Sequence, residues 1–488
     1  MTDPASGLVA RARDARVVVV GGGLAGLVAA LECAKVGIGV TLVEAADRVG
    51  GGIVAADLGG VAVDVGADSF DPPEGAFRAL LEDLGLSGDI VAPAVGALWV
   101  AGLPAGLAPL PRQSIVGIPA NPFADDVRRI IGWRGAWRAY LDRLRPPLTI
   151  GHARSLGALV RARMGDRVVD RMVAPAVRAR FGVDPDRLEI DAAIPGLNGA
   201  LTRAGSLSGA VAELLASTPD GTPRAALRGG MTRLVDALQE RLADLGVTVT
   251  RSTRVRSIAG TEDGWLVACD TRTPAGSDGE MPAVESPAIE TPDELRADAV
   301  ILATDEAEAR RLLRPHVDLP AADAPTPGRD DLALLVDATA LGAPQGIAAA
   351  VLEGTVVRDA TAEWPWLAEA LGPTVRLLRV TLPADGGDSD PVDRALRAAS
   401  TVTGAPLTRA ELRGAHRVRW VPPSPAAAID HAATTVAIRR SVHAVGLAVV
   451  GGWLSGGDPA QVAEDAVAEA DRVRAHALWG TPLGHSTH

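Results

Sequence analysis

The segment of the chain with the clearest chemical potential is a glycine-rich run near the N-terminus. Gly21, Gly23 and Gly26 have the spacing GxGxxG. In that motif the first glycine permits a tight turn, the second lets a pyrophosphate approach the backbone, and the third lets a helix pack on a strand. The first turn of the helix then offers free N–H groups and a positive dipole end to the phosphates. The run therefore predicts a dinucleotide-phosphate site.

A carboxylate stands where such a site needs one. Glu44 ends a second β-branched run, 18 positions after Gly26. There it can accept hydrogen bonds from the hydroxyls of a ribose. For the glycine motif alone, a turn without a function is the alternative. Strand, helix and acid in register favour nucleotide binding.

The elements that position these residues follow from the apolar patterns. Short β-branched runs predict strands, and apolar residues at helical spacing predict helices. Both ends of the chain have Rossmann-like character, so the two termini must meet in one nucleotide-binding domain. The sequence predicts an α/β fold: a Rossmann-like domain with an inserted α+β substrate domain and a helical middle domain. The expected strands are 16–20, 39–43, 247–249, 265–268, 299–303 and 447–450, and the expected helices are 24–36, 155–177, 195–215, 231–245 and 459–477.

Composition excludes several classes of function. The formal net charge of −12 over 488 residues argues against nucleic acid as the main partner. No apolar run reaches the roughly 18 residues of a membrane span, and no secretory signal opens the chain. Cys33 and Cys269 have no CxxC partner, so we expect two reduced thiols, no metal site and a cytoplasmic location.

Three further segments extend the glycine motif. They are Ala46–Gly51 (ADRVGG), Asp64–Asp68 (DVGAD) and the turn Gly451–Gly457, after which Asp458 and Pro459 open a helix. Together they resemble the FAD motifs of the flavin amine oxidase and protoporphyrinogen oxidase superfamily. The resemblance implies FAD as the cofactor. The positive end of the last helix would then stabilise charge on the reduced flavin.

Other segments resemble bacterial protoporphyrinogen and coproporphyrinogen oxidases in order and spacing, from about residue 16 to about residue 473. They include Gln113–Pro119, Ser155–Val160, Asp184–Leu188, Gly229–Met231 and Arg419-Trp420. This resemblance implies oxidation of a porphyrinogen, coproporphyrinogen III or protoporphyrinogen IX, to the porphyrin in haem biosynthesis. O2 would be the acceptor. The flavin would take the hydride, so no protein side chain is assigned as catalytic.

The same resemblance implies two sets of site residues. Three arginines would bind the propionates of the substrate, because arginine suits bidentate carboxylate binding: Arg178, Arg180 and Arg203. The cofactor-binding residues would be Gly21, Gly23, Leu24, Ala25, Gly26, Glu44, Ala45, Arg48, Gly50, Gly51, Gly66, Ala67, Asp68, Val255, Ala303, Thr304, Trp420, Gly451, Trp453, Gln461 and Val462.

The domain organisation follows from these assignments. We expect the FAD-binding domain in three parts, with a helical or membrane-facing segment and a substrate segment between them. A polar stretch at 271–296 is expected to be a flexible insertion. A homodimer and a weak peripheral membrane contact stay open. The boundaries are 1–72, 226–310 and 431–488 for the FAD-binding parts, 73–225 for the helical part and 311–430 for the substrate part.

Four departures from the family pattern keep two other hypotheses open. No basic residue follows Gly51 in the run Gly52–Ala55, and arginines occupy positions 178 and 180. Glu363 precedes Trp364 where the family usually has a Lys-Trp pair. The run Ser424–Ala427 has lost the polar glutamine and the aromatic tyrosine of the family's Met-Pro-Gln-Tyr pattern. The chain could instead be a flavin oxidase of another substrate, such as an amine oxidase, although Trp453 alone offers an aromatic cage. It could also be a non-catalytic relative that keeps the fold.

Overall fold

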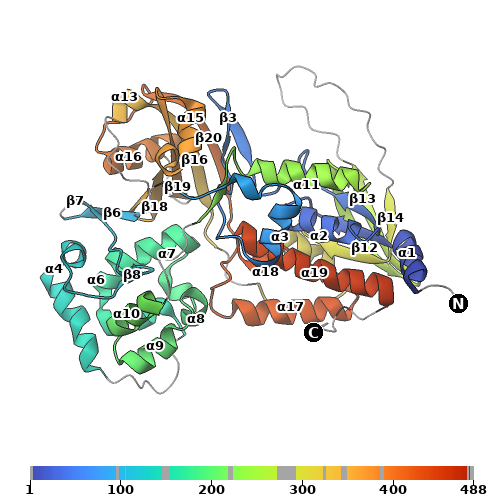
Figure 1. Cartoon of the computed structure of the whole chain (residues 1–488), viewed down its shortest axis with the longest axis horizontal. Coiled ribbons are helices and arrows are strands. Elements are labelled where there is room, and N and C mark those ends of the chain that lie inside the picture. The colour runs from blue at the N-terminus through green and yellow to red at the C-terminus, as the bar shows by residue number, and fades with distance from the viewer. Residues whose placement is uncertain are drawn as a thin grey trace.

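The structure, a computed structural model, describes residues 4–94, 98–104, 106–145, 154–217, 224–271, 293–322, 326–341, 349–384, 389–480 and 483. Three bodies are visible in Figure 1: a nucleotide-binding domain that contains both chain ends, a body built on a large sheet, and a helical body. The first of these matches the expectation that the two termini meet.

A five-stranded sheet forms the centre of the nucleotide-binding domain. All its strand pairs are parallel, in the order β11-β2-β1-β15-β21. The strand after β15 in this order comes from the C-terminal end of the chain, so the predicted assembly from distant segments is confirmed. The strands are β1 (Arg16–Val20), β2 (Gly39–Val43), β11 (Thr248–Thr250), β15 (Ala299–Leu302) and β21 (Leu447–Val449).

Alternate residues of each central strand enter different cores, because side chains alternate across a sheet. Val17 and Val19 pack among helices on one face, and Val18 and Val20 pack on the other face. The first face is covered by α1 (Pro4–Asp14), α2 (Leu24–Ala34), α3 (Gly75–Asp83), α11 (Thr232–Asp244) and α19 (Pro459–Trp479). The second is covered by the antiparallel strands β12 (Thr253–Thr261), β13 (Gly264–Thr271) and β14 (Glu294–Ala297), and by α12 (Glu306–Leu313), α17 (His431–Ala444) and α18 (Gly452–Ser455).

A seven-stranded sheet, in the order β20-β16-β19-β18-β17-β6-β7, forms the second body. Its pairs are antiparallel except for β17 with β6. The strands are β6 (Leu98–Leu103), β7 (Gly106–Pro109), β16 (Arg329–Asp337), β17 (Ala349–Leu352), β18 (Thr355–Asp359), β19 (Val375–Pro383) and β20 (Leu412–Trp420). The accompanying helices are α13 (Ala338–Leu341), α14 (Ala360–Glu363), α15 (Pro365–Leu371) and α16 (Pro391–Thr403).

The helical body contains the helical region that the sequence predicts at 155–215, but the two expected helices are broken into shorter ones, with Gly165 and Gly205 at breaks. Its helices enclose one continuous apolar core. They are α4 (Asp125–Tyr140), α5 (Leu156–Met164), α6 (Asp166–Val168), a π-helical turn (Val169–Val173), α7 (Ala174–Phe181), α8 (Ile190–Ala193), α9 (Leu197–Ala204) and α10 (Leu207–Ser217).

Short elements complete the connections between the bodies. The 3₁₀ turns are Ser87–Asp89, Leu141–Leu144 and Pro185–Arg187. The two-stranded pairs are the hairpin β3 (Ala55–Leu58) with β4 (Val61–Asp64), β5 (Ile90–Val91) with β10 (Ala226–Leu227), and β8 (Ser114–Ile115) with β9 (Ile118–Pro119).

Some details differ from the sequence-based expectation. The edges of the expected insertion at 271–296 are strands, because β13 reaches Thr271 and β14 begins at Glu294; its interior, 272–292, lies outside the described residues. Strands β6 and β7 lie in the segment 73–225 yet complete the seven-stranded sheet. Among the described residues, none of the helices combines the length and hydrophobicity that a bilayer span requires.

Candidate functional site

Gly21 and Gly26 have the backbone geometry that the motif requires, while the role of Gly23 toward a pyrophosphate stays a prediction. Gly21 adopts φ +108°, and a Cβ there would lie 2.5 Å from the carbonyl oxygen of Ala303. A Cβ on Gly26 would lie 1.9 Å from the oxygen of Gly21, so helix α2 can approach β1 only without a side chain. Gly23 is the N-cap of α2, and a Cβ added to it would meet no atom closer than 3.8 Å. The helix N-terminus is therefore open on the side that a phosphate would approach.

Two more glycine loops stack against the first. The N–H of Gly50 donates to Gly22 O at 2.8 Å, and the N–H of Ala67 donates to Gly52 O at 2.9 Å. A Cβ on Gly66 would lie 2.1 Å from that same Gly52 oxygen. The predicted segments 21–26, 46–51 and 64–68 therefore lie in layers against one another, joined through Gly22, Gly50, Gly52 and Ala67, and this layered backbone is called the cradle.

Glu44 lies at the edge of this cradle. Its carboxylate accepts hydrogen bonds from the N–H of Gly22 at 2.5 Å and of Ala46 at 2.7 Å. The N–H of Thr253 donates to Glu44 O at 2.9 Å, which places the beginning of β12 beside the backbone of Glu44; Val255 lies two residues further along this strand, in the apolar core, and its contact with a cofactor stays a prediction. Ala45 and Arg48 are exposed on the following turn. A ribose next to the pyrophosphate would meet the carboxylate here.

The C-terminal turn lies next to Thr304, which follows the residue, Ala303, that packs against Gly21. Gly451 adopts φ +138°, and a Cβ there would lie 3.4 Å from Thr304 O. Asp458 caps α19 through the N–H of Ala460 at 2.9 Å and also accepts from the N–H of Asp71 at 3.1 Å. The predicted N-cap is confirmed. The side chain of Gln461 instead turns toward Gly456, where a Cβ would lie 2.9 Å from its Oε1.

The residues in this region fit a bound dinucleotide. Gly23 and Gly52 leave open backbone, and no atom lies within 4 Å of the position that a Cβ would take on Gly52. The indole Nε1 of Trp453 is buried and has no hydrogen-bond acceptor among the described residues. Val462 lies beside the turn, 3.8 Å from where a Cβ of Gly452 would be. Open glycine backbone and an unpaired buried donor are what a ligand with phosphate and carbonyl oxygens would satisfy.

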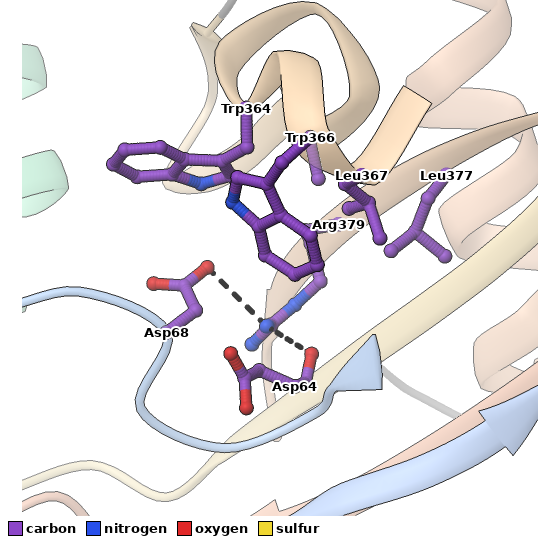
Figure 2. Close-up of a pocket in the computed structure, with 8 residues that line it drawn as sticks. Asp64, Asp68, Trp364, Trp366, Leu367, Leu377 and Arg379 are labelled. Carbon is purple, nitrogen blue, oxygen red and sulfur yellow. Dashed lines mark hydrogen bonds and ion pairs between the residues drawn. The ribbon is translucent and has the colours of Figure 1, made fainter. Parts of the chain in front are cut away.

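A buried ionic network, which the sequence does not predict, ties the loop 64–68 to the seven-stranded sheet. Arg379 of β19 donates to the carbonyl oxygens of Asp64 at 2.6 Å and Gly66 at 2.9 Å, and lies 3.3 Å from the Asp68 carboxylate. Arg358 of β18 donates to Asp68 at 2.8 Å and to Glu363 at 2.7 Å. Figure 2 shows Arg379 between Asp64 and Asp68, with Trp364 and Trp366 across a small cavity.

The carboxylates in this network have shifted pKa values in opposite directions. Burial raises the pKa of Asp64 to about 7, and the charge of Asp68 adds to the effect, although the N–H of Met231 and the charge of Arg379 oppose it. Burial also opposes ionisation of Asp68, but Arg358 and Arg379 hold its pKa well below its usual range. The network therefore keeps one carboxylate charged and leaves the other near the point of protonation at neutral pH.

The predicted substrate arginines lie in the helical body and not in the cradle. Arg178 forms an ion pair with Asp184 at 2.6 Å, and Arg203 forms one with Glu213 at 2.6 Å. Arg180 is exposed, with its guanidinium 5.4 Å from the Phe181 ring. Their role in substrate binding stays a prediction.

Trp420, a predicted cofactor-binding residue, ends β20. Its indole N–H donates to Asp331 at 2.6 Å. Three residues later, the Pro423 ring lies against the C-terminal turn, 3.4 Å from where a Cβ of Gly452 would be and 3.2 Å from where one of Gly457 would be. Because three residues span at most about 10 Å, Trp420 lies close to that turn.

Comparison with known proteins supports the same cofactor and family. Residues 24–333 match the family described as flavin containing amine oxidoreductase. A coproporphyrinogen III oxidase of Propionibacterium freudenreichii subsp. freudenreichii is 32% identical over 358 residues, which are 66% of this chain and 63% of that relative. A coproporphyrinogen III oxidase of Staphylococcus aureus is 27% identical over 322 residues, 60% of this chain and 68% of the relative. The matched region thus spans less than two thirds of the first relative.

Solved structures share the fold. A candidate protoporphyrinogen oxidase from Exiguobacterium sp. 255-15 superposes with a TM-score of 0.77 at 21% identity, covering 94% of this chain and 98% of the other. Cyclohexylamine oxidase from Brevibacterium oxydans IH-35A gives a TM-score of 0.61 at 15% identity, with coverages of 94% and 98%. Because the family match at residues 24–333 covers more than half of the chain, the chain belongs to the flavin-containing amine oxidoreductase family, and its cofactor is FAD.

Proposed function

We propose that this protein is an FAD-dependent oxidase that converts coproporphyrinogen III to coproporphyrin III, with O2 as the acceptor. The observation that carries the proposal is the 32% identity over 358 residues to a relative of that name. The names of further relatives favour coproporphyrinogen III over protoporphyrinogen IX, because the Bacillus subtilis and Mycobacterium tuberculosis proteins, at 33% and 32% identity, are also coproporphyrinogen III oxidases by name.

The contacts in the cradle support this chemistry. Bound FAD supplies the acceptor for a hydride and returns the electrons to O2. The chain would supply position: Arg379 donates to the carbonyls of Asp64 and Gly66 and so holds in place the Gly66-Ala67 backbone, which by the family resemblance would pass near the flavin ring. The N-terminus of α19, capped by Asp458, presents its positive dipole end to the same region.

Two spectroscopic measurements test the function. The purified full-length protein, reconstituted with FAD, should have a flavin absorbance spectrum and should generate porphyrin fluorescence from coproporphyrinogen III faster than from protoporphyrinogen IX. Porphyrinogens oxidise slowly in air, so the same mixture without protein is the control. Flavin-loaded protein that does not accelerate either reaction would exclude the proposed substrate class. Protein that cannot bind FAD would point to the non-catalytic hypothesis.

We also propose a weak peripheral contact between the helical body and an anionic membrane surface. Trp133, Trp137, Leu141 and Leu144 are exposed by 60%, 56%, 46% and 77%. Exposed arginines at 134, 143 and 145 lie in the same segment. Exposed tryptophan and arginine side chains close together in one segment suit the interface of an anionic bilayer.

Sedimentation with vesicles tests the contact. Wild type should bind vesicles that contain phosphatidylglycerol more strongly than vesicles of phosphatidylcholine alone. Replacing both Trp133 and Trp137 with alanine should reduce the bound fraction. Equal binding of the wild type and the double variant would reject the contact. A homodimer stays a prediction.

A further inference from the structure

Arg329, the first residue of β16, has an unusual environment. Its side chain is 29% exposed, and its guanidinium carbon lies 4.3 Å from the centre of the Trp420 ring. Its Nε lies 3.3 Å from Asp331 Oδ2, a contact that is an ion pair without good hydrogen-bond alignment. Within the described part of the chain, neither of its two terminal nitrogens has a hydrogen-bond acceptor.

Four neighbouring arginines have carboxylate or carbonyl acceptors for their hydrogen bonds. Arg358 and Arg379 donate to Asp68 and to other acceptors in the buried network. Arg417 and Arg419 both donate to the buried carboxylate of Asp330. Arg329 therefore differs from these four arginines, because the two terminal nitrogens of its fork are free to bind an anion.

The location of Arg329 suits a substrate contact. A Cβ on Gly182, which caps α7 of the helical body, would lie 3.5 Å from Arg329 Nη1. On its other side, Trp420 leads to Pro423, which packs on the C-terminal glycine turn of the FAD cradle. Arg329 thus lies where the helical body, the seven-stranded sheet and the cradle meet.

We propose that Arg329 binds a carboxylate of the substrate, with Nη1 and Nη2 forming a bidentate contact and Trp420 supporting the plane of the guanidinium. The inference rests on the proposed function, because coproporphyrinogen III carries propionate groups. It assigns the contact to a residue other than Arg178 and Arg203, whose guanidinium groups already have acidic partners. Burial and the charge of Arg379 lower the pKa of Arg329 against the effect of Asp331, and an added carboxylate would favour its charged form.

The test compares Arg329→Gln with a matched control, Arg419→Gln. Both variants lose one positive charge. Arg419 precedes Trp420 and pairs in register with Asp330, so its side chain lies on the opposite face of the sheet from Arg329. The probes are coproporphyrin III and its tetramethyl ester, which has no carboxylates. Binding to the FAD-loaded protein is followed by the change in porphyrin fluorescence, and flavin content and thermal midpoint are measured for every variant.

We expect the wild type and Arg419→Gln to bind the acid more tightly than the ester. Arg329→Gln should weaken binding of the acid by roughly 10- to 100-fold, the loss expected for a charge-assisted contact, and should leave binding of the ester unchanged. Arg329→Lys, which keeps the charge but loses the fork, should lie between them. It also replaces Arg329→Gln as the test variant if the latter loses FAD.

Three results would overturn the inference in distinguishable ways. If the wild type binds the acid and Arg329→Gln binds it equally well, the carboxylate contact lies elsewhere and the proposed function is untouched. If the FAD-loaded wild type binds neither porphyrin, the proposed function fails and the inference fails with it. Equal weakening of acid and ester would also reject the contact, because a carboxylate-specific role cannot affect the ester.

Discussion

The raised pKa of Asp64 gives a prediction that does not depend on the substrate. Asp64 ends β4, and its carboxylate accepts the N–H of Met231, just before α11, at 2.9 Å. Burial raises its pKa from 3.8 to about 7, and the charge of Asp68 contributes in the same direction. The change is Asp64→Asn, which keeps the shape and the acceptor for Met231 but cannot ionise.

Proton linkage gives the direction in which the free energy of unfolding changes with pH. Between pH 3.8 and about 7 the folded protein keeps a proton on Asp64 that the unfolded chain has released. The stability from this group is complete below pH 3.8 and is lost as the pH rises through about 7. At about 1.4 kcal/mol for each unit of pH, the loss from pH 5 to pH 8 is roughly 2–3 kcal/mol. Asp64→Asn should not show this loss.

Thermal unfolding of the FAD-loaded protein at several values between pH 5 and pH 8 measures the effect. The midpoint of Asp64→Asn minus that of the wild type should increase from pH 5 to about pH 7 and level off above that pH. Asp57→Asn, an exposed substitution in the same β3–β4 hairpin, is the matched control and should give a constant difference. A constant difference for Asp64→Asn as well would refute the assignment of a buried, proton-binding carboxyl group.

Five further substitutions test the cradle and its support. Gly26→Ala places a Cβ 1.9 Å from a backbone oxygen and should lower the thermal midpoint of the apoprotein. The Cβ of Gly23→Ala would lie in open space, so this variant should keep the thermal midpoint and mainly weaken FAD binding, as measured by flavin titration. Arg379→Gln leaves Asp68 with one arginine partner fewer and should destabilise by about 3–5 kcal/mol, measured by urea unfolding. Glu363→Lys brings two cations together and should reduce stability, and Arg358→Glu in the same chain should restore part of the loss in that assay.

The backbone of the cofactor site could be predicted from the sequence because its requirements are local. A glycine at 21 is needed for φ +108°, and a glycine at 26 is needed because no Cβ fits against β1. Both conditions act within a few residues of one strand and one helix. The C-terminal turn could be predicted for the same reason, since Asp458 and Pro459 define where α19 begins.

The ionic network could not be predicted, because it depends on strand order. Arg379 reaches carbonyl oxygens more than 300 positions earlier in the sequence, across two bodies of the fold. The one signal in the sequence was the position of Arg379 between Leu378 and Val380 in β19, where its side chain is buried. A charged residue at such a position is rarely buried without a partner. The pattern could therefore indicate a buried contact but could not identify Asp64, Gly66 or Asp68.

The departures from the family pattern can now be interpreted through their partners. Glu363, in place of the usual lysine, accepts from Arg358 at 2.7 Å, and Arg358 also binds Asp68. The reversed charge therefore has a cation beside it, and a paired arginine on β18 supplies the positive charge that the lysine would have brought. Arg48, with Nη2 3.4 Å from Gly51 O, similarly places a cation at the loop that lacks a following basic residue. In both cases the side chain changed while the backbone cradle kept its form, so these departures alone do not argue for loss of FAD.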